Sequence, residues 1–199
     1  CKWQHWPYEM HLQYKQKQVL DALQRIAKVE LPEINPIMGS ANTQFYRNKL
    51  EYTFSNKCWL TTEQLQSGEE FPERDALGFH IPGAFDKVLD IKKCWLQHDI
   101  SNDIRLFIRQ LAISRGYSFY DLKAQHGLMR TIMIRTASTG EIMLVVVFGE
   151  NDKSAIKDVM DEICAKFPQI TSLQYVINLK VNDTIADQEL IIFNGRDLI

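Results

Sequence analysis

The sequence lacks any apolar run long enough to cross a membrane. Its longest apolar segment, Ile142–Phe148, is far below the roughly 18 residues that a transmembrane helix needs. No basic stretch followed by an apolar one opens the chain, so secretion is not indicated. Cysteine is also scarce, and its scatter excludes a disulfide scaffold and predicts a reducing, cytoplasmic location. The cysteines are Cys1, Cys58, Cys94 and Cys164.

The common sequence motifs of enzymes are absent as well. There is no glycine-rich phosphate or dinucleotide loop, no G-x-S-x-G nucleophile elbow and no H-E-x-x-H metal motif. There is no C-x-x-C pair, so no self-contained zinc or redox site can be identified. The chain by itself is therefore predicted to bind a partner and to hold no catalytic residue.

What the sequence does contain is typical of a folded domain. Of its 199 residues, 45% are hydrophobic and 11% are aromatic, which excludes intrinsic disorder. The formal net charge is −2, but residues 87–135 hold nine basic and four acidic side chains. Such an excess can attract a polyanion such as nucleic acid, although a solvated face explains the same count.

The two ends of the chain suggest a piece of a longer protein. The sequence begins with Cys1 in place of Met and stops at residues 197–199 without a polar tail. Natural termini are usually polar and frayed. We therefore expect this chain to have been cut from a longer protein.

Hydrophobic periodicity predicts an α+β fold: a mainly antiparallel sheet covered by helices, with an N-terminal helical arm. An apolar stripe predicts a helix over residues 9–28, and the prolines of residues 31–43 indicate a linker. Residues 46–54 alternate as a half-buried strand, whereas the acidic residues 61–75 are expected to form a loop. Further strands are expected at residues 76–81, 87–91, 128–136, 141–148, 173–179 and 189–193, and helices after the caps Ser101 and Asn151 or Asp152.

Two parts of the sequence resemble a known family of RNA-modifying enzymes. One is the start of the chain, residues 1–5 (CKWQH). The other combines residues 46–55 (YRNKLEYTFS) with residues 77–94 (LGFHIPGAFDKVLDIKKC). Together they resemble the S-adenosylmethionine-dependent RNA uracil-5-methyltransferases, which act on 23S ribosomal RNA and, in some members, on transfer RNA.

The resemblance implies a parent enzyme with three domains: an oligonucleotide-binding-type barrel, a central RNA-binding domain and a Rossmann-like methyltransferase domain. This chain is similar to the central domain. Residues 1–34 would form an N-terminal segment with the helical arm, and residues 35–199 the RNA-binding α+β domain. The parent would methylate C5 of a uridine, while this chain would lack the catalytic groups. Its expected partners are RNA and the two other domains of the same protein, and no membrane.

The resemblance also implies an iron–sulfur site. In the family, a C-G-G-C-x-x-Q-H stretch and one later cysteine hold a [4Fe–4S] cluster. Cys1 matches the last cysteine of that stretch, because Gln4 and His5 follow it at the matching spacing, and Cys94 matches the later one. Two ligands cannot hold a cubane that uses four thiolates, so we expect neither the cluster nor S-adenosylmethionine on this chain alone.

Seven side chains are predicted to contact RNA. Cations would bind phosphates, and aromatic rings would stack on unpaired bases. The competing interpretation is a solvated surface charge for each or, for Phe85, a core ring. For the whole chain, the alternative is a protein–protein interaction module with no nucleic-acid role. The seven residues are Arg47, Lys49, His80, Phe85, Lys87, Arg130 and Arg135.

Overall fold

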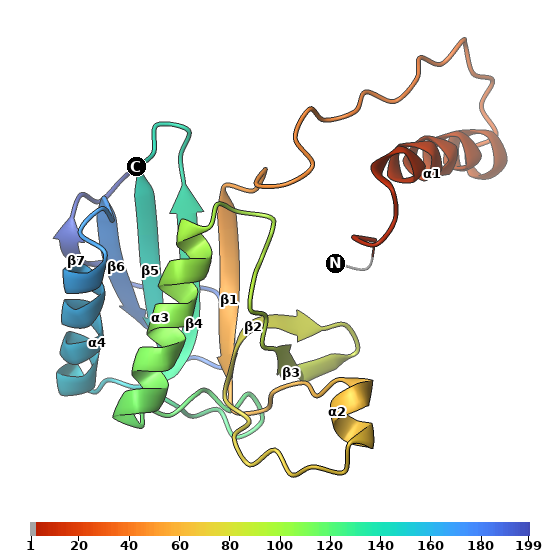
Figure 1. Ribbon diagram of the computed structural model, residues 1–199. Coiled ribbons are helices and arrows are strands. Elements are labelled where there is room, and N and C mark those ends of the chain that lie inside the picture. The colour runs from red at the N-terminus through yellow and green to blue at the C-terminus, as the bar shows by residue number, and fades with distance from the viewer. Residues whose placement is uncertain (1–2) are drawn as a thin grey trace. The chain divides into compact units, whose positions relative to one another are not determined.

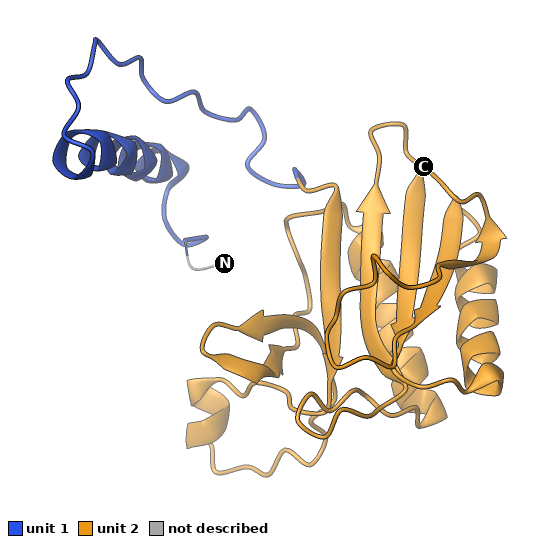
Figure 2. Cartoon of the chain, turned by 180° about the vertical axis from the view of Figure 1, so that it is seen from behind, with its two compact units in different colours: residues 1–46 blue, residues 47–199 orange. Residues whose placement is uncertain are grey.

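The computed structural model of the chain describes residues 3–199. The chain divides into two compact units, residues 1–46 and residues 47–199 (Figure 2). Within the described part, no helix is both long enough and apolar enough to cross a membrane.

The first unit is built around the helix α1 (Tyr8–Asp21), which continues as a π-helical turn over Ala22–Ile26. The expected N-terminal helical arm is therefore confirmed. None of these helical residues is buried, and Val19 is 56% exposed. The chain then returns along the helix, where the main-chain nitrogen of Ile37 donates to Gln16 Oε1 (3.0 Å). The apolar stripe that the sequence predicted thus remains partly exposed within this unit.

The second unit is built on a seven-stranded sheet in the order β3-β2-β1-β4-β5-β6-β7 (Figure 1). All neighbouring strands are antiparallel except β5 and β6, which are parallel and joined through a helix. This confirms the expected α+β class with a mainly antiparallel sheet. The strands are β1 (Lys49–Ser55), β2 (Ala76–Ile81), β3 (Ala84–Leu89), β4 (Met129–Thr136), β5 (Ile142–Phe148), β6 (Ser172–Ile177) and β7 (Ile191–Gly195).

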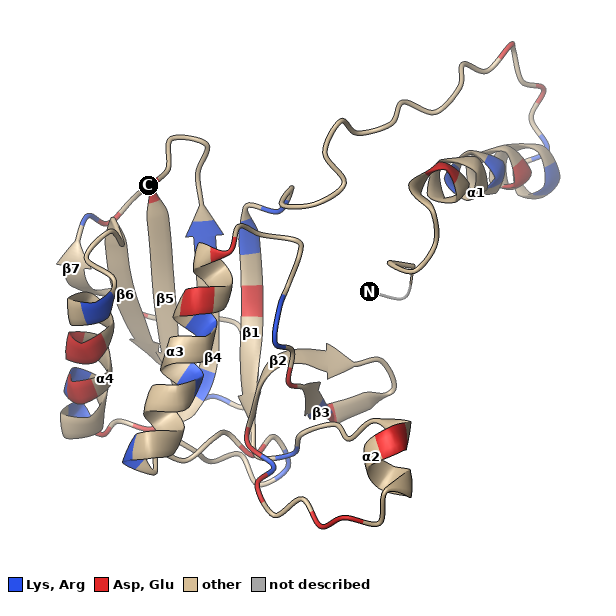
Figure 3. Cartoon of the chain, viewed as in Figure 1, with Lys and Arg blue, Asp and Glu red and all other residues tan. Residues whose placement is uncertain are grey.

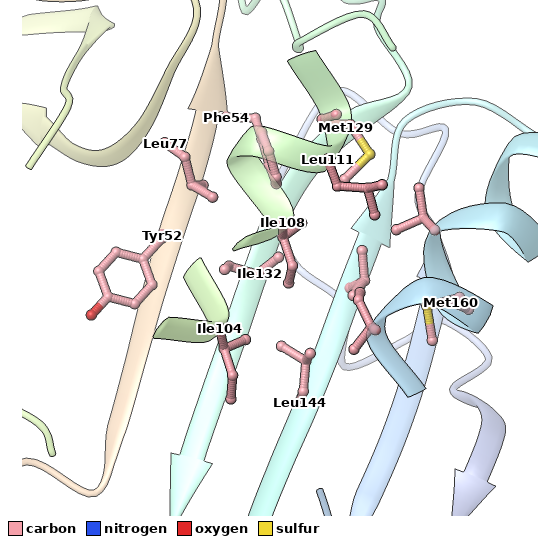
Figure 4. Close-up of a cluster of buried hydrophobic side chains, with 14 of the residues drawn as sticks. Tyr52, Phe54, Leu77, Ile104, Ile108, Leu111, Met129, Ile132, Leu144 and Met160 are labelled. Carbon is pink, nitrogen blue, oxygen red and sulfur yellow. The ribbon is translucent and has the colours of Figure 1, made fainter. Parts of the chain in front are cut away.

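Two helices, α3 (Ile100–Arg115) and α4 (Lys153–Lys166), cover one face of this sheet (Figure 1). Their apolar stripes face inward, and Ile104 and Ile108 of α3 and Val159 of α4 are fully buried. Figure 4 shows the core that these helices form with the central strands. Removing this apolar surface from water is the main favourable contribution to folding.

The strand β1 alternates between buried and exposed residues, as its sequence predicts. Leu50, Tyr52 and Phe54 are buried in the core, whereas Lys49 and Glu51 keep about half of their side chains exposed. Successive side chains of a strand point to opposite faces of the sheet. The charged residues of β1 therefore lie on the face away from α3 and α4.

That second face is partly covered by the segment between β6 and β7, residues 178–190 (Figure 2). Ile185 of this segment packs against a small apolar cluster formed by Val145, Val147 and Val176. Among β1, β4 and β5, charged side chains are exposed only near the start of β1 and the adjoining end of β4.

Three elements differ from the sequence prediction. The strand expected at residues 87–91 begins earlier, as β3 at Ala84, and ends at Leu89. The helix α3 starts after Asp99, and Ser101 is no cap, because it lies buried in the first turn and its hydroxyl donates to Gln97. Residues 61–75 contain the short helix α2 (Thr62–Gln66), which begins with a reciprocal capping box. Five residues are too short a window for helical periodicity to show.

Candidate nucleic-acid interface

Three of the predicted RNA-binding residues come together at one end of the sheet. The register of β1 and β4 places Lys49 directly opposite Arg135, and Arg47 lies two residues before Lys49. Figure 3 shows basic residues at the adjoining ends of these two strands. We call Arg47, Lys49 and Arg135 the sheet-end cations. Like charges opposite each other destabilise an antiparallel pair, so this arrangement favours an anionic ligand.

Ion pairing neutralises the sheet-end cations only in part. Lys49 Nζ lies 2.6 Å from a carboxylate oxygen of Glu51, and both side chains remain substantially exposed. Within residues 3–199, Arg47 and Arg135 are exposed and neither forms an ion pair. Exposed ion pairs contribute only about 0–1 kcal/mol, so Lys49 can exchange its carboxylate for a phosphate at little cost.

The loop that precedes α3 (residues 91–99) holds this end of the sheet in place. Gln97 is fully buried, and its side-chain nitrogen donates to the main-chain oxygens of Asn48 and Ile134, each at 3.2 Å. The main-chain nitrogen of Arg47 also donates to this loop, at 2.8 Å. The loop therefore fixes the backbone on which the sheet-end cations stand, so little conformational entropy is lost when they bind.

The same loop carries a cation–π pair of a lysine and a tryptophan that the sequence prediction missed. Lys93 Nζ lies 4.0 Å from the ring centroid of Trp95, whose side chain is 48% exposed. Exposed aromatic rings are the surfaces on which proteins stack unpaired RNA bases. The signal in the sequence was a tryptophan beside two lysines in a segment without helix or strand periodicity.

Three other predicted residues, His80, Phe85 and Lys87, lie on the hairpin of β2 and β3. Phe85 is 66% exposed and is therefore not a core ring. Its centroid is 6.0 Å from Lys123 Nζ, and Lys87 Nζ lies 5.5 Å from the centroid of Trp59. This hairpin thus combines exposed rings with cations, the residue types that single-stranded RNA requires.

The seventh predicted residue, Arg130, is buried, with 1% of its surface exposed. Its Nη1 donates to the main-chain oxygens of Asn178 and Lys180, both at 2.7 Å, and its Nη2 donates to Asp183 at 2.9 Å. Its guanidinium also stacks 4.5 Å from the ring centroid of Tyr120. Arg130 therefore anchors the segment between β6 and β7, and we leave it out of the interface.

Of the two predicted cluster ligands, Cys1 lies outside the described residues. Cys94 lies in the 91–99 loop with 6% of its surface exposed. Asn102 fixes its backbone, because the Cys94 nitrogen donates to Asn102 Oδ1 (2.8 Å) and Asn102 Nδ2 donates to the Cys94 oxygen (3.1 Å). No three histidine, cysteine or acidic side chains gather as a metal site in the part of the chain that the structure describes.

Two buried polar groups interact electrostatically with Cys94. Tyr52 Oη and Arg105 Nε have no hydrogen-bond partner in the described part of the chain. Burial raises the pKa of the Tyr52 phenol, and the Cys94 thiol raises this pKa further, while Arg105 opposes the shift. Cys94 itself belongs to the hydrophobic core cluster, and the residues described around it form no metal site.

No family model matches the chain. Over its whole length, the chain is 56% identical to a protein of Porphyromonas gingivalis that carries the name uncharacterized RNA methyltransferase. Proteins of the same name from Bacteroides thetaiotaomicron and Chlorobaculum tepidum are 53% and 35% identical to it. The chain is thus similar to a part of proteins that are named RNA methyltransferases. It spans 44%, 44% and 41% of the lengths of these three relatives.

A solved structure shares the fold of this chain. The tRNA (uracil-54, C5)-methyltransferase of Pyrococcus abyssi, crystallised with S-adenosyl-L-homocysteine, aligns with a TM-score of 0.63 and 20% identity. The alignment covers 98% of this chain and 40% of the archaeal one. The relationship that the motifs predicted is thus confirmed at the level of RNA methyltransferases, and the shared fold agrees with it.

Proposed function

We propose that this chain is the RNA-binding part of an enzyme that uses S-adenosylmethionine to methylate C5 of a uridine. The observation that carries the proposal is the sheet-end cations, which place like charges opposite each other on an exposed face. The relatives named RNA methyltransferases support it, as does the archaeal neighbour that acts on a tRNA uracil. The chain spans under half of its relatives' lengths, which supports assigning the chemistry to other parts of the protein.

We assign residues 1–34 to an N-terminal segment with the helical arm and residues 35–199 to the RNA-binding domain. The compact units divide after residue 46, so this assignment counts the linker of residues 35–46 with the RNA-binding domain. A barrel domain and a Rossmann-like methyltransferase domain of the same protein would complete the enzyme. We propose that it works in the cytoplasm, on 23S ribosomal RNA during its processing or on transfer RNA.

The proposed reaction explains why a separate binding surface is needed. In this scheme a thiolate of the methyltransferase domain adds to C6 of the uridine, and C5 takes the methyl group from S-adenosylmethionine, which leaves as S-adenosylhomocysteine. A base then removes the C5 proton while the bond between C6 and sulfur breaks and releases the thiolate. The target base must first leave its stack, which costs a few kcal/mol. In this scheme the sheet-end cations hold the phosphates around the displaced base. The rings of Phe85 and Trp95, with His80 and Lys87, contact unpaired neighbouring bases.

We also propose that Cys94 and Cys1 are two of the four ligands of a [4Fe–4S] cluster, the other two thiolates lying outside this chain. When bound, such a cluster supplies one-electron chemistry or braces the fold around its ligands. The role of this chain is to position the Cys94 sulfur. The two hydrogen bonds between Asn102 and the main chain of Cys94 fix this backbone, as a ligand of a cluster shared between distant segments would require.

The double substitution Arg47→Ala with Arg135→Ala tests the RNA-binding proposal. We expect the affinity of the chain for a structured fragment of 23S ribosomal RNA to fall. The slope of log affinity against log salt should become shallower by about 0.7–0.9 for each phosphate contact removed. Fluorescence anisotropy at a series of salt concentrations measures both quantities.

A matched control removes two lysines from the opposite side of the sheet. Lys153→Ala with Lys157→Ala changes the net charge equally, but both residues are exposed on α4, which covers the other face. This control should retain the affinity and the salt slope of the unchanged chain. If both double variants lose the same affinity, or if the unchanged chain binds neither ribosomal nor transfer RNA, the proposal is wrong.

A further inference from the structure

A pocket of about 310 Å³ opens near the sheet-end cations, between the start of α3 and the turn that joins β4 to β5. We call it the turn pocket. Figure 1 shows this turn at the end of the sheet where β1 and α3 begin. The turn is held in shape, because the main-chain nitrogens of Ala137 and Gly140 donate to the main-chain oxygens of Glu141 and Ala137, both at 3.0 Å. One wall of the pocket is therefore formed before any ligand binds.

The lining of the turn pocket combines apolar side chains with a few small polar groups. Ile100 and Ile142 supply the apolar side chains, and Ile142 is only 7% exposed. Thr136 and Ser138 add hydroxyl groups, and His98 adds an imidazole ring. Hydroxyl groups and imidazole nitrogens can form hydrogen bonds with the edge of a nucleobase. Ligand sites commonly have this composition, in which apolar groups supply contact area and a few polar groups fix orientation.

The charges of the lining decide which kind of ligand fits. Neither lysine nor arginine lines the turn pocket, so no cation there would hold a phosphate. Its one carboxylate, that of Glu141, forms an ion pair with Arg196 and accepts from the Thr139 hydroxyl at 2.6 Å. This pairing leaves Glu141 little charge with which to attract a cation or repel a polyanion. A neutral ring with polar edges therefore suits the lining better than a phosphate or a cation.

The groups that could bind phosphate lie at the same strand ends as the turn pocket. Arg135 directly precedes Thr136, and successive side chains of a strand point to opposite faces of the sheet. The main-chain nitrogen of Thr136 donates to the main-chain oxygen of Asn48 at 2.9 Å, and Asn48 lies between Arg47 and Lys49. This adjacency brings a base within reach of the pocket when its own phosphate pairs with Arg135.

We propose that the turn pocket receives one unpaired base of the RNA, while the sheet-end cations hold the phosphates beside it. This inference rests on the RNA-binding function proposed above and narrows its substrate class. Stacking and pairing cover the faces and the edge of a base in a duplex, so only a base in a loop or bulge can enter. The base is distinct from the target uridine, whose chemistry we assigned to another domain. The chain should therefore prefer RNA with unpaired nucleotides to a continuous duplex.

The test compares two RNA probes by fluorescence anisotropy: a hairpin with an unpaired loop, and a continuous duplex with the same number of nucleotides. Ser138→Leu fills the turn pocket without adding a ring on which a base could stack. We expect this variant to bind the hairpin about tenfold more weakly, comparable with the loss of one stacked base, and to bind the duplex unchanged. Its salt slope should equal that of the unchanged chain, because no phosphate contact is lost.

Ser114→Leu is the matched control, because Ser114 is exposed near the other end of α3 and does not line the turn pocket. It should bind both probes like the unchanged chain. If Ser138→Leu does not fold, Ala137→Leu fills the same pocket and takes its place. An unchanged preference for the hairpin in the pocket variants, or an equal loss in Ser114→Leu, would overturn the proposal.

Equal affinity of the unchanged chain for hairpin and duplex would also overturn the pocket proposal. In that case the RNA-binding function would still stand, provided that Arg47→Ala with Arg135→Ala weakens binding to both probes. A chain that binds neither probe would contradict the RNA-binding function itself, and the pocket proposal with it. The two proposals thus fail in distinguishable ways.

Discussion

Arg130 links two distant parts of the second unit through a single side chain. Its guanidinium donates to main-chain oxygens of residues 178–182 and to the carboxylate of Asp183, from a position with almost no exposed surface. Buried carbonyl groups must find donors, and here one arginine serves several of them. The residue thus stabilises the segment that covers the second face of the sheet.

Replacing Arg130 with methionine should lower the free energy of unfolding by roughly 3–5 kcal/mol, since it leaves buried carbonyl oxygens and Asp183 unpaired. Urea denaturation of the chain measures this change. Arg135→Met on the same strand is the control, because that side chain is exposed and its loss should change stability by only about 0.5 kcal/mol. Equal losses in the two variants would contradict the anchoring role.

Strand alternation places Arg130 and Arg135 on opposite sides of one strand, but the partners that bury Arg130 could not be predicted from the sequence. Both are arginines of one strand, and a count of charges treats them alike. The register between β4 and β5 shifts between Met129 and Thr131, and the partners of Arg130 come from a segment far along the chain. Local sequence patterns reveal neither the register shift nor these distant partners. The interface prediction therefore included an arginine that is buried.

At the scale of elements, the start of α4 depends on one cap. The Asp152 carboxylate accepts from the main-chain nitrogens of Ser154 and Ala155, both at 3.0 Å. These are two of the helix's unpaired N-terminal donors. The helix packs its buried face on the core, so fraying at its start affects the whole unit.

Asp152→Ala should therefore lower the free energy of unfolding by about 1 kcal/mol. The control is Thr61→Ala, which removes the corresponding cap of α2. That helix has no buried residue, so its fraying remains local and the global transition should move less. Thermal and urea unfolding of both variants gives the comparison. A larger effect at Thr61 would mean that α2 belongs to the cooperative core.

Periodicity predicted the larger elements because burial itself is periodic. The alternation of β1 and the stripes of α3 and α4 correspond to the residues that the core contains. The ends of the elements were less predictable. Serine is a residue type that often caps helices, but Ser101 lies buried in the first turn of α3, where its hydroxyl donates to Gln97. A cap is defined by hydrogen-bond geometry, and residue type alone does not determine it.

At the scale of the molecule, the sheet order creates the candidate interface. Lys49 and Arg135 are far apart in the sequence and become neighbours only because β4 pairs with β1. The turn residues Pro82-Gly83 and Ser138-Thr139-Gly140 favour local hairpins of β2 with β3 and of β4 with β5, but nothing in the sequence indicates the long-range pair of β1 and β4. The strand alternation therefore predicted which residues face outward, while the grouping of the cations required the fold.

A second long-range connection joins the turn after Tyr120 to the end of β1. The Asp121 carboxylate accepts from Lys57 Nζ (2.9 Å), from Asn56 Nδ2 (3.1 Å) and from the main-chain nitrogens of Lys123 and Ala124. These hydrogen bonds, with that from Lys57 the strongest influence, hold the pKa of Asp121 far below its usual value of 3.8. The contact therefore stabilises the folded state only while Asp121 is ionised.

The stability from Asp121 is fully present above pH 3.8, the unfolded value, and is lost as the pH falls toward the lower folded-state pKa. Asp121→Asn should thus be less stable at neutral pH, and its stability should fall less steeply between about pH 4 and pH 2. Urea denaturation across this range measures both effects. Asp161→Asn removes an exposed ion pair on α4 and should keep the steeper profile; a flattened profile there would contradict the assignment.

The buried amide of Gln97 has a consequence for how the molecule moves. It ties the start of β1 and the end of β4 to the loop that carries Cys94 and Trp95, and it also accepts from the first turn of α3. A displacement of any one of these segments is therefore transmitted through Gln97 to the others. If the sheet-end cations bind RNA as proposed, a load on them would pass through Gln97 to the backbone of the loop that carries Cys94. That end of the sheet and this loop would then move as one stiff body.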